Sequence, residues 1–373
     1  NSPTACGSLL YSPVTIKISD SLSSVANSNS YLISLYIKDS VVQNGYYVYE
    51  RNTSYYDYFT YETSTGASSN STSGTVISGL SSVYTNSPPT TLYIPGVNKN
   101  GQALSIKDNS TLGLVSTTTS IVILNGLKEI GNSAFSWKNF LTSVIIPNTV
   151  TRIGDEAFYG VAITNIDIPD SVKSIGYQAF RGCTALQSIT LGSGLTTLGA
   201  SVFHECIKLK SVVIPNSVTS IGNGLFEGCE ALTSVKLPDG LQSIGDYMFK
   251  ACDNLSSITI PSNVKTIGSN AFEGCISLTS ITIPSSVTTI GDYAFYYCRK
   301  LKSITIPASV TKIGKGAFIS CNALTSLIFS DTTTWYATTN SGYTGGTSIS
   351  VSSSSTNLTN FKTTYKSYYW YKV

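Results

Sequence analysis

The sequence contains one histidine among 373 residues, and this scarcity limits the catalytic chemistry that it can support. A Ser-His-Asp or Cys-His catalytic arrangement would have to use His204, which stands in the segment Phe203-His204-Glu205-Cys206. Carboxylates are sparse, no pair of them recurs at a meaningful spacing, and no glycine-rich phosphate loop is present. We therefore interpret His204 as a surface residue and predict that the protein is not an enzyme.

Charged residues make up only 12% of the chain, and the formal net charge is +3. Nucleic-acid binding needs clustered lysine and arginine, so this composition argues against a nucleic-acid partner. No run of about 18 apolar residues occurs, so no transmembrane helix is predicted. No Cys-x-x-Cys pair occurs, and the sequence therefore gives no support for a zinc, redox or other cofactor site.

The composition also bears on location. Uncharged polar residues and tyrosine are abundant while lysine and glutamate are scarce, and this balance favours an extracellular protein of the cell surface. The chain begins with polar residues and shows no signal peptide, which fits either a mature exported form or a cytosolic protein.

What the sequence does contain is a repeat of 23 residues, and the segments 255–275, 278–298 and 301–321 are nearly the same phrase. A fixed period between about 20 and 29 residues indicates a solenoid of stacked coils. One glycine per coil marks the register, at successive spacings of 23, 22 and then 23 residues throughout: Gly131, Gly154, Gly176, Gly199, Gly222, Gly245, Gly268, Gly291 and Gly314.

One coil shows what each repeat must form. Its apolar positions are Leu278, Ile281, Ile283, Val287, Ile290, Ala294, Phe295 and Cys298. The first three end in a period-two alternation, which predicts a short strand with an inward face, ended by Pro284. The next two predict a second extended piece, and the last three return to the core through one helical or 3₁₀ turn. Gly291 permits either a positive φ or a close approach to the neighbouring coil.

The phrase L-x-S-I-x-I-P-x-S-V-x-x-I-G-x-x-A-F-x-x-C resembles the leucine-rich repeats of the BspA-like family, strongly over about residues 120–328. The resemblance implies a right-handed leucine-rich-repeat solenoid, horseshoe-like in the α/β sense but strand-rich and with little regular helix. It also implies a class of surface proteins associated with binding host matrix proteins such as fibronectin and fibrinogen, and with cell aggregation.

Seven cysteines occupy one column of the repeat, each 23 residues from the next: Cys183, Cys206, Cys229, Cys252, Cys275, Cys298 and Cys321. Neighbouring coils should lie about 4.8 Å apart, a distance that could admit a disulfide. Seven thiols cannot all pair, and side-chain directions in a parallel ladder disfavour pairing, so we expect free, buried cysteines that act as small apolar groups.

The segments before the repeat differ in composition. Residues 1–65 do not repeat, and we expect a small all-β module with strands at 14–18, 31–37 and 46–49. Its many tyrosines could stack on sugars or anchor a protein, although tyrosine also suits half-buried strands. Cys6, in Thr4-Ala5-Cys6-Gly7, resembles a bacterial lipidation site, so a lipid anchor is a possible alternative to an ordinary thiol. Residues 66–74 are Ser- and Gly-rich and predict a linker or loop.

The solenoid itself is expected over residues 75–328, with degenerate first coils over 75–119. Residues 329–373 leave the period and are rich in aromatic residues, which predicts a C-terminal cap over the last coil. Sugar stacking by an exposed Trp335 or Trp370 is the alternative interpretation.

Strand alternation predicts three outward-facing files of side chains along the first strand of every coil. One file is almost entirely serine, and the other two vary in chemistry, as a recognition surface requires. The alternative is a solvated sheet face that binds nothing. We select eight candidate partner-binding residues on this ribbon: Asp167, Thr190, Lys210, Lys236, Thr259, Thr282, Lys302 and Thr305.

Three functions remain open at this point. The first is a non-enzymatic surface protein that mediates adhesion or protein–protein interaction through the ribbon. The second is a carbohydrate-binding surface protein that uses the tyrosine cluster or the tryptophans of the cap. The third is a structural spacer that displays the N-terminal module.

Overall fold

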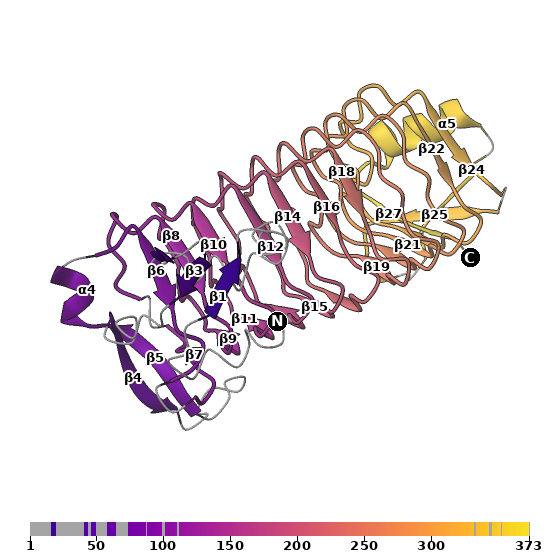
Figure 1. Ribbon diagram of the computed structural model, residues 1–373. Helices are drawn as coiled ribbons and strands as arrows, with labels where there is room; N and C mark the ends of the chain where they lie inside the picture. The colour runs from indigo at the N-terminus through magenta and orange to yellow at the C-terminus, as the bar shows by residue number, and fades with distance from the viewer. Residues whose placement is uncertain are drawn as a thin grey trace.

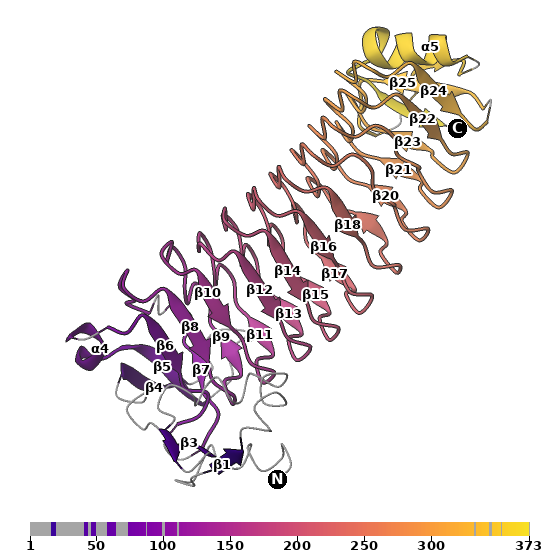
Figure 2. The ribbon, with the colours of Figure 1, turned by 45° about the horizontal axis from the view of Figure 1, so that its top comes forward.

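The computed structural model describes residues 58–64, 74–86, 88–98, 101–109, 112–331, 333–342, 345–351 and 353–372, together with three strands near the N-terminus. Figure 1 and Figure 2 show the coils from β5 to β24 lying side by side in an elongated, gently twisted stack. The predicted fold class, a strand-rich leucine-rich-repeat solenoid with little regular helix, is confirmed. The helices of the described residues are short: α4 (Ser82–Asn86), α5 (Ser354–Thr359) and a π-helical segment, η5 (Asn360–Thr364).

The first strand of each coil forms one side of the stack, and neighbouring strands pair in parallel. Side chains alternate between exposed and buried, as in β12, where Ile166 and Ile168 face the core. This is the period-two pattern that the repeat predicts. The strands of this side are β6 (Thr91–Ile94), β8 (Ser120–Ile123), β10 (Ser143–Ile145), β12 (Asn165–Ile168), β14 (Ser188–Leu191), β16 (Ser211–Val213), β18 (Ser234–Lys236), β22 (Ser303–Ile306) and β24 (Ser326–Phe329).

The segment around Ile281 and Ile283, where a strand was predicted, does not form a continuous set of main-chain hydrogen bonds with its neighbours. Between β18 and β22 the pairing on this side is reduced to an isolated bridge between Ser280 and Ser303 and to single bonds, such as Thr279 N–H to Ser256 O at 3.1 Å. Both isoleucines are nevertheless buried. The apolar pattern determines which side chains point inward, but it does not bring every pair of main chains within hydrogen-bonding distance.

The second side consists of two-residue parallel strands. Each strand except β7, which is followed by Lys107, is followed by the repeat glycine, whose φ is not positive. A Cβ on Gly291 would lie 2.5 Å from the backbone of Gly268 and Ser269, so close approach between coils explains the glycine. These strands are β7 (Ser105–Ile106), β9 (Glu129–Ile130), β11 (Arg152–Ile153), β13 (Ser174–Ile175), β15 (Thr197–Leu198), β17 (Ser220–Ile221), β19 (Ser243–Ile244), β20 (Thr266–Ile267), β21 (Thr289–Ile290) and β23 (Lys312–Ile313).

The third side is built from turns. Around Phe295, where one helical or 3₁₀ turn was expected, the chain forms single turns closed by bonds between residues three apart, such as Tyr296 N–H to Tyr293 O at 2.9 Å, and not a regular helix. Two positions per coil have a positive φ, for example Tyr293 (53°) and Tyr297 (64°). This alternation breaks a helix and directs backbone N–H groups along the stack, as in Phe295 N–H to Ala317 O at 2.9 Å. Beneath the turns the phenylalanine rings stack with centroids 5.2–6.0 Å apart. We call this side the turn face.

The cysteine column lies under the turn face, next to the phenylalanines. All seven thiols are buried and none forms a disulfide, as expected from the register. Burial is the main cause that raises the pKa of each of these thiols, to about 12 for Cys183. Val161 occupies the same position one coil earlier and is fully buried, so the column accepts a hydrocarbon side chain as readily as a thiol.

Antiparallel strands close both ends of the stack. At the first coils β4 (Phe59–Ser64) pairs with β5 (Gly74–Leu80), which itself pairs in parallel with β7. At the last coils β27 (Tyr369–Lys372) pairs antiparallel with β23 and with β25 (Trp335–Thr338), and β26 (Thr347–Ile349) completes the sheet. Figure 2 shows α5 over the same end. Such pairing removes the open strand edges that a solenoid otherwise presents.

Trp335 and Trp370 belong to this terminal structure and are each only 1% exposed. Trp370 stacks on Phe361 with a centroid distance of 3.8 Å, and Phe361 packs edge-on against Phe318, the last ring of the column. The alternative that an exposed Trp335 or Trp370 stacks on sugars is therefore wrong, because the two indoles fill the space above the last coil.

The N-terminal expectations are tested only in part. The strands β1 (Ile16–Ser19), β2 (Val41–Gln43) and β3 (Tyr46–Tyr49) form an antiparallel sheet in the order β1-β3-β2. The strand expected at 31–37, the candidate lipid site at Cys6 and the linker before β5 lie outside the described residues. Of the tyrosine cluster, the side chains of Tyr58 and Tyr61 are described, and both pack against the core.

Candidate functional site: the outward ribbon and the groove beside it

The ribbon predicted from strand alternation lies on the first side of the coils. All eight selected side chains are exposed: Asp167, Thr190, Lys210, Lys236, Thr259, Thr282, Lys302 and Thr305. Parallel pairing brings successive members into register, since Asp167 lies opposite Thr190. The exposure that recognition requires is therefore present at every predicted position, and a binding role for these residues stays a prediction.

Two apolar members of the ribbon were not selected from the sequence. Val213 lies opposite Lys236 in the paired strands β16 and β18 and is 61% exposed, and Ile328 lies opposite Thr305 and is 48% exposed. Single exposed apolar side chains are normal on protein surfaces, but on this ribbon each would add apolar area to a contact with a partner. The signal that could have found them is the same alternation, because a branched apolar residue at an outward position serves no core.

Part of the ribbon serves the stack itself. Several threonine hydroxyls in the file before the strand donate to a carbonyl of the preceding coil, as in Thr233 Oγ1 to Lys210 O at 3.1 Å and Thr279 Oγ1 to Ser256 O at 3.3 Å. These bonds explain the preference for threonine at such positions without a ligand. The file that contains Lys236 and Thr305 varies more in charge and size, which makes it the better candidate for recognition.

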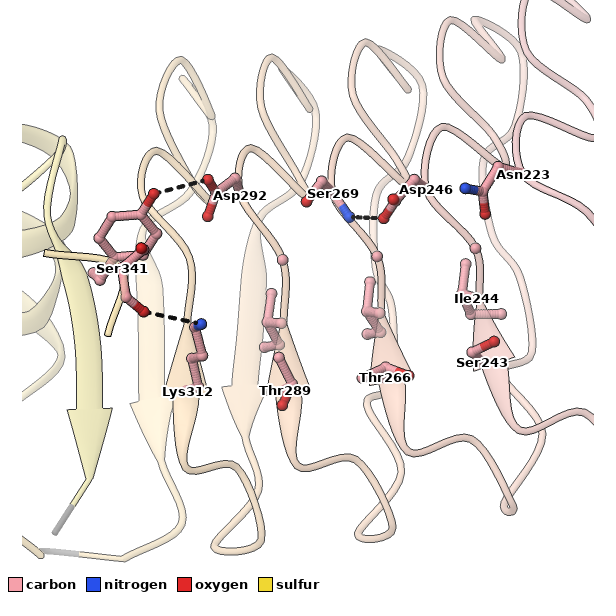
Figure 3. Close-up of a pocket in the computed structure, with 16 residues that line it drawn as sticks. Asn223, Ser243, Ile244, Asp246, Thr266, Ser269, Thr289, Asp292, Lys312 and Ser341 are labelled. Carbon is pink, nitrogen blue, oxygen red and sulfur yellow. Dashed lines mark hydrogen bonds between the residues drawn. The ribbon is translucent and has the colours of Figure 1, made fainter. Parts of the chain in front are cut away.

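The second side of the stack holds a groove with a cavity volume of about 490 Å³, shown in Figure 3. Its lining runs along β19, β20, β21 and β23, with hydroxyl groups of Ser243, Thr266 and Thr289. Lys312 and Ser341 close the end next to the C-terminal strands, where Lys312 Nζ donates to Ser341 O at 3.3 Å. The groove thus combines a file of hydroxyl groups with a file of isoleucines, Ile244, Ile267 and Ile290.

The acidic side chains of this groove bond to the protein itself. Asp246 Oδ1 accepts a hydrogen bond from Ser269 N–H at 2.7 Å, and Asp292 Oδ2 accepts one from the Tyr369 hydroxyl at 3.3 Å. Burial, followed by the charge of Asp292, raises the pKa of Tyr369. Asp246 thus links two neighbouring coils, and Asp292 binds Tyr369 of β27. These contacts stabilise the fold, and they explain the two carboxylates without a ligand.

His204 lies on the turn face, with its Nε2 3.8 Å from Glu205 Oε1. Burial is the main cause that lowers the pKa of His204, so the imidazole is neutral at pH 7. The nearby Cys206 is fully buried, and burial raises its pKa well above the usual value, so it stays a thiol rather than a thiolate. The expected surface role of His204 agrees with its half-buried position.

Among the residues described, no cluster of three or more potential ligands could hold a metal ion. Over the same residues, no helix has the length and apolar character needed to cross a membrane.

The stacked coils and the phrase that they repeat define a leucine-rich-repeat solenoid protein. The family model for the BspA type leucine rich repeat region, which describes six copies of the repeat, matches twice, over residues 106–233 and 219–341, and the two matches together cover more than half of the chain. The chain belongs to this family of BspA-type leucine-rich-repeat proteins. Membership of this family supports a role for the repeat in protein–protein interaction. No curated protein matches the chain.

One solved structure supports the same fold, and two others are reported as similar. A leucine-rich repeat protein from Bacteroides ovatus is 28% identical, with a TM-score of 0.53, and the match covers 74% of this chain and 70% of that one. The pneumococcal vaccine antigen PcpA is 20% identical over 79% of this chain and 82% of its own, with a TM-score of 0.48. A leucine rich cell surface protein from Faecalibacterium prausnitzii is 21% identical over 78% and 95%, with a TM-score of 0.38.

Proposed function

We propose that the protein is a non-enzymatic protein of the cell surface that binds a protein partner through the ribbon, in adhesion to host matrix or in cell aggregation. The observation that carries this proposal is that all eight predicted ribbon residues are exposed on one side of the stack. An extended face of varied side chains, repeated coil after coil, is how solenoid proteins build binding surfaces.

The chemistry of the ribbon sets the expected strength of binding. Serine and threonine hydroxyls form hydrogen bonds but bury little apolar area, so they contribute modestly to affinity. Val213 and Ile328 add exposed apolar area, and Lys210, Lys236 and Lys302 add positive charge. With so few charges, we expect the affinity to depend only weakly on salt concentration.

The remaining segments fit the same scheme as proposals. Residues 1–65 would form a module at one end, joined by residues 66–74 to a solenoid of residues 75–328, and residues 329–373 would cap the other end. The polar and tyrosine-rich composition supports an extracellular location. A lipid anchor at Cys6 would hold the first module near the membrane.

The test is a triple variant of the ribbon, Lys236→Glu, Thr259→Arg and Thr282→Arg, in solid-phase binding to immobilised fibronectin and fibrinogen. We expect weaker binding and an unchanged melting temperature, because the three side chains point into solvent. A matched control changes the equivalent chemistry on another exposed file: Lys265→Glu, Thr288→Arg and Thr311→Arg.

A third protein lacks residues 1–65 and separates the ribbon from the N-terminal module. Normal binding by this truncation together with weak binding by the ribbon variant supports the proposal. The reverse pattern contradicts it and makes the N-terminal module the binder and the solenoid its stalk.

A further inference from the structure

The chain has three tryptophans, and they lie in opposite environments. Trp335 and Trp370 are each 1% exposed, whereas Trp137 is 68% exposed on the turn face. An indole left in water loses the stabilisation that burial gives to such a large apolar group. The exposed ring of Trp137 therefore contributes little to the core, and its presence needs another explanation.

The backbone conformation of Trp137 is the one that recurs at its position of the coil. Its φ is 60°, in the left-handed region, at a position of the coil where glycine stands in Gly160 (68°) and Gly182 (68°). Glycine adopts this conformation without strain, and an aromatic residue does not. The coil imposes this conformation, since Glu205, Ala251, Tyr297 and Ser320 share it at the same position of their coils. The left-handed backbone therefore sets the direction in which the Trp137 side chain leaves the turn face.

The ring of Trp137 is held in place from below by the next coil. A Cβ on Gly160 would lie 3.0 Å from Trp137 Cε3, so the indole rests directly on the glycine backbone. The ring of Tyr159 lies beside it, with a centroid distance of 4.6 Å and an interplanar angle of 56°. Trp137 and Tyr159 thus form a supported aromatic platform, and its open part faces solvent.

Hydrogen-bonding groups border the Trp137–Tyr159 platform. The guanidinium of Arg181 lies over the Tyr159 ring, 5.6 Å from its centroid. Its Nε is 3.6 Å from Glu205 Oε2, beyond hydrogen-bonding distance, and this buried nitrogen has no hydrogen-bond partner in the protein. Because Nε is buried, a ligand could be met only by the terminal nitrogens of the Arg181 guanidinium, whose side chain is 28% exposed and pairs with Glu205.

Tyr297 occupies the same position of its own coil as Trp137, and the two sites differ in whether a cation covers the ring. Tyr297 also has a positive φ and lies near Tyr296, at a centroid distance of 5.9 Å. There, however, the guanidinium of Arg299 covers the ring at 4.1 Å from its centroid. At the Trp137 site, the cation lies over Tyr159 rather than over the indole, so the indole face stays accessible.

We propose that the Trp137–Tyr159 platform binds a neutral saccharide, with the apolar face of one pyranose ring stacked on the indole and Arg181 donating to its hydroxyl groups. A stable protein interface needs roughly 800 Å² from each partner, and the two adjoining rings of Trp137 and Tyr159 offer a much smaller patch. Two adjoining rings instead match one or two sugar units. This site is separate from the ribbon, which lies on another side of the coils.

Tryptophan fluorescence of the full chain tests the proposal directly, because Trp137 is the only tryptophan that solvent reaches. The probes are three soluble neutral oligosaccharides, chitotriose, cellotriose and lactose, and one anionic polysaccharide, heparin. We expect at least one neutral probe to change the emission in a saturable way and to protect the protein from quenching by acrylamide. No response to any of the three neutral probes would overturn the proposal.

Calorimetric titration with the responding sugar then compares variants. Trp137→Gly places at this position the residue that neighbouring coils already use, so it removes the ring without threatening the fold. We expect it to weaken binding by about tenfold or more. Tyr297→Gly is the matched control at the equivalent position and should leave the affinity unchanged, and Arg181→Gln should weaken it to a smaller extent.

Two outcomes contradict the saccharide assignment. One is binding of heparin alone, abolished by Arg181→Gln and retained by Trp137→Gly, which would mean a charge contact without stacking. The other is loss of matrix-protein binding in Trp137→Gly with no sugar response, which would make the platform part of a protein interface. Neither outcome affects the ribbon test, since the two sets of variants lie on different sides of the coil.

Discussion

The thiol of Cys206 donates a hydrogen bond to the backbone carbonyl oxygen of Phe180, one coil earlier, at an Sγ–O distance of 3.1 Å. The same oxygen accepts the backbone N–H of Cys183 at 3.2 Å. Every cysteine of the column repeats this thiol bond, at 3.0–3.2 Å. This hydrogen bond joins neighbouring coils, and only a protonated thiol can donate it. The column therefore stabilises the stack only while its cysteines are neutral.

Burial of the thiols predicts their reactivity. In a Cys6→Ser background, so that the readout is the column alone, we expect a thiol-reactive dye at neutral pH to label the native protein slowly. Unfolding in denaturant should make all seven cysteines react, because labelling requires exposure and a thiolate. Rapid labelling of native protein would contradict the buried column.

The same thiols predict a loss of stability at alkaline pH. Burial raises the pKa of Cys183 from its usual value of 9.0 to about 12, so the folded state keeps protons that the unfolded state releases in this interval. The stabilisation is complete below pH 9.0 and falls as the pH rises toward about 12. Denaturant unfolding followed as a function of pH measures it.

Cys183→Val supplies the control for this alkaline effect, because Val161 fills the equivalent position one coil earlier. The carbonyl of Phe158 keeps its bond from Val161 N–H at 3.2 Å, so the variant should lose less than about 1.5 kcal/mol at neutral pH. It should also lose less stability than wild type on going to alkaline pH. An unchanged slope would mean that other groups cause the alkaline loss.

The left-handed positions of the turn face predict opposite effects for two reciprocal substitutions. Ala251 has a φ of 56°, and Gly274, the equivalent residue one coil later, has a φ of 73°. A left-handed conformation costs a residue with a Cβ about 1–2 kcal/mol, while glycine adds about 0.5–1 kcal/mol of entropy cost. We expect Ala251→Gly to stabilise the protein by about 0.5–1 kcal/mol.

Gly274→Ala should destabilise by a similar amount in chemical denaturation. A Cβ there meets Ala251 Cα at 3.6 Å, an ordinary contact, so the effect reports the backbone conformation and not a clash. Equal signs for the two substitutions would refute the strain interpretation.

These positions show how much of the molecule the sequence can predict. The 23-residue period predicted the coils, the inward Phe and Cys columns and the outward ribbon, because core side chains must recur once per coil. It predicted a strand at Ile281 and Ile283 where the main chains form only an isolated bridge and single bonds, since apolar alternation reports burial and not hydrogen bonding. It also predicted a helical turn where left-handed residues direct N–H groups to the next coil.

The candidate sites were less predictable than the fold. Composition suggested that Trp335 and Trp370 could bind sugars. Their burial, however, depends on how residues 329–373 fold over the last coil, and these residues do not follow the repeat, so the pattern could not predict it. Trp137 was not singled out. The available signal was its place in the register, where later coils have Gly160 and Gly182.

Truncation of one phenylalanine of the column should cause a large loss of folding free energy, felt mainly by its own coil and the neighbouring coils. Phe272 is fully buried between Phe249 and Phe295, at centroid distances of 5.3 and 5.4 Å. Phe272→Ala should cost about 3–5 kcal/mol in denaturant unfolding, as for a large-to-small change in a packed core. The exposed Val213→Ala is the control and should stay within about 0.5 kcal/mol of wild type. An unchanged melting curve for the phenylalanine variant would mean that the register is wrong.

Removal of the Trp370 ring, which covers the last coil, should lower stability only at the C-terminal end of the stack. Trp370 is buried against Phe361 and lies opposite Ile313 in the pairing of β27 with β23. Trp370→Ala should cost about 3–5 kcal/mol locally, because it leaves a cavity between the last coil and its cover. Coils of a solenoid interact mainly with their neighbours, so the loss should stay near the C-terminal end.

Hydrogen exchange measured by mass spectrometry tests this locality. In Trp370→Ala, we expect faster exchange in peptides that contain β23 and β24, and unchanged exchange around β8 and β10, at the far end of the stack. The exposed Trp137→Gly serves as the control, since it removes the same kind of ring from the surface and should leave exchange at both β23 and β8 unaltered. Uniformly faster exchange in all coils of Trp370→Ala would contradict the nearest-neighbour description, because the stack would then be opening as a single cooperative unit.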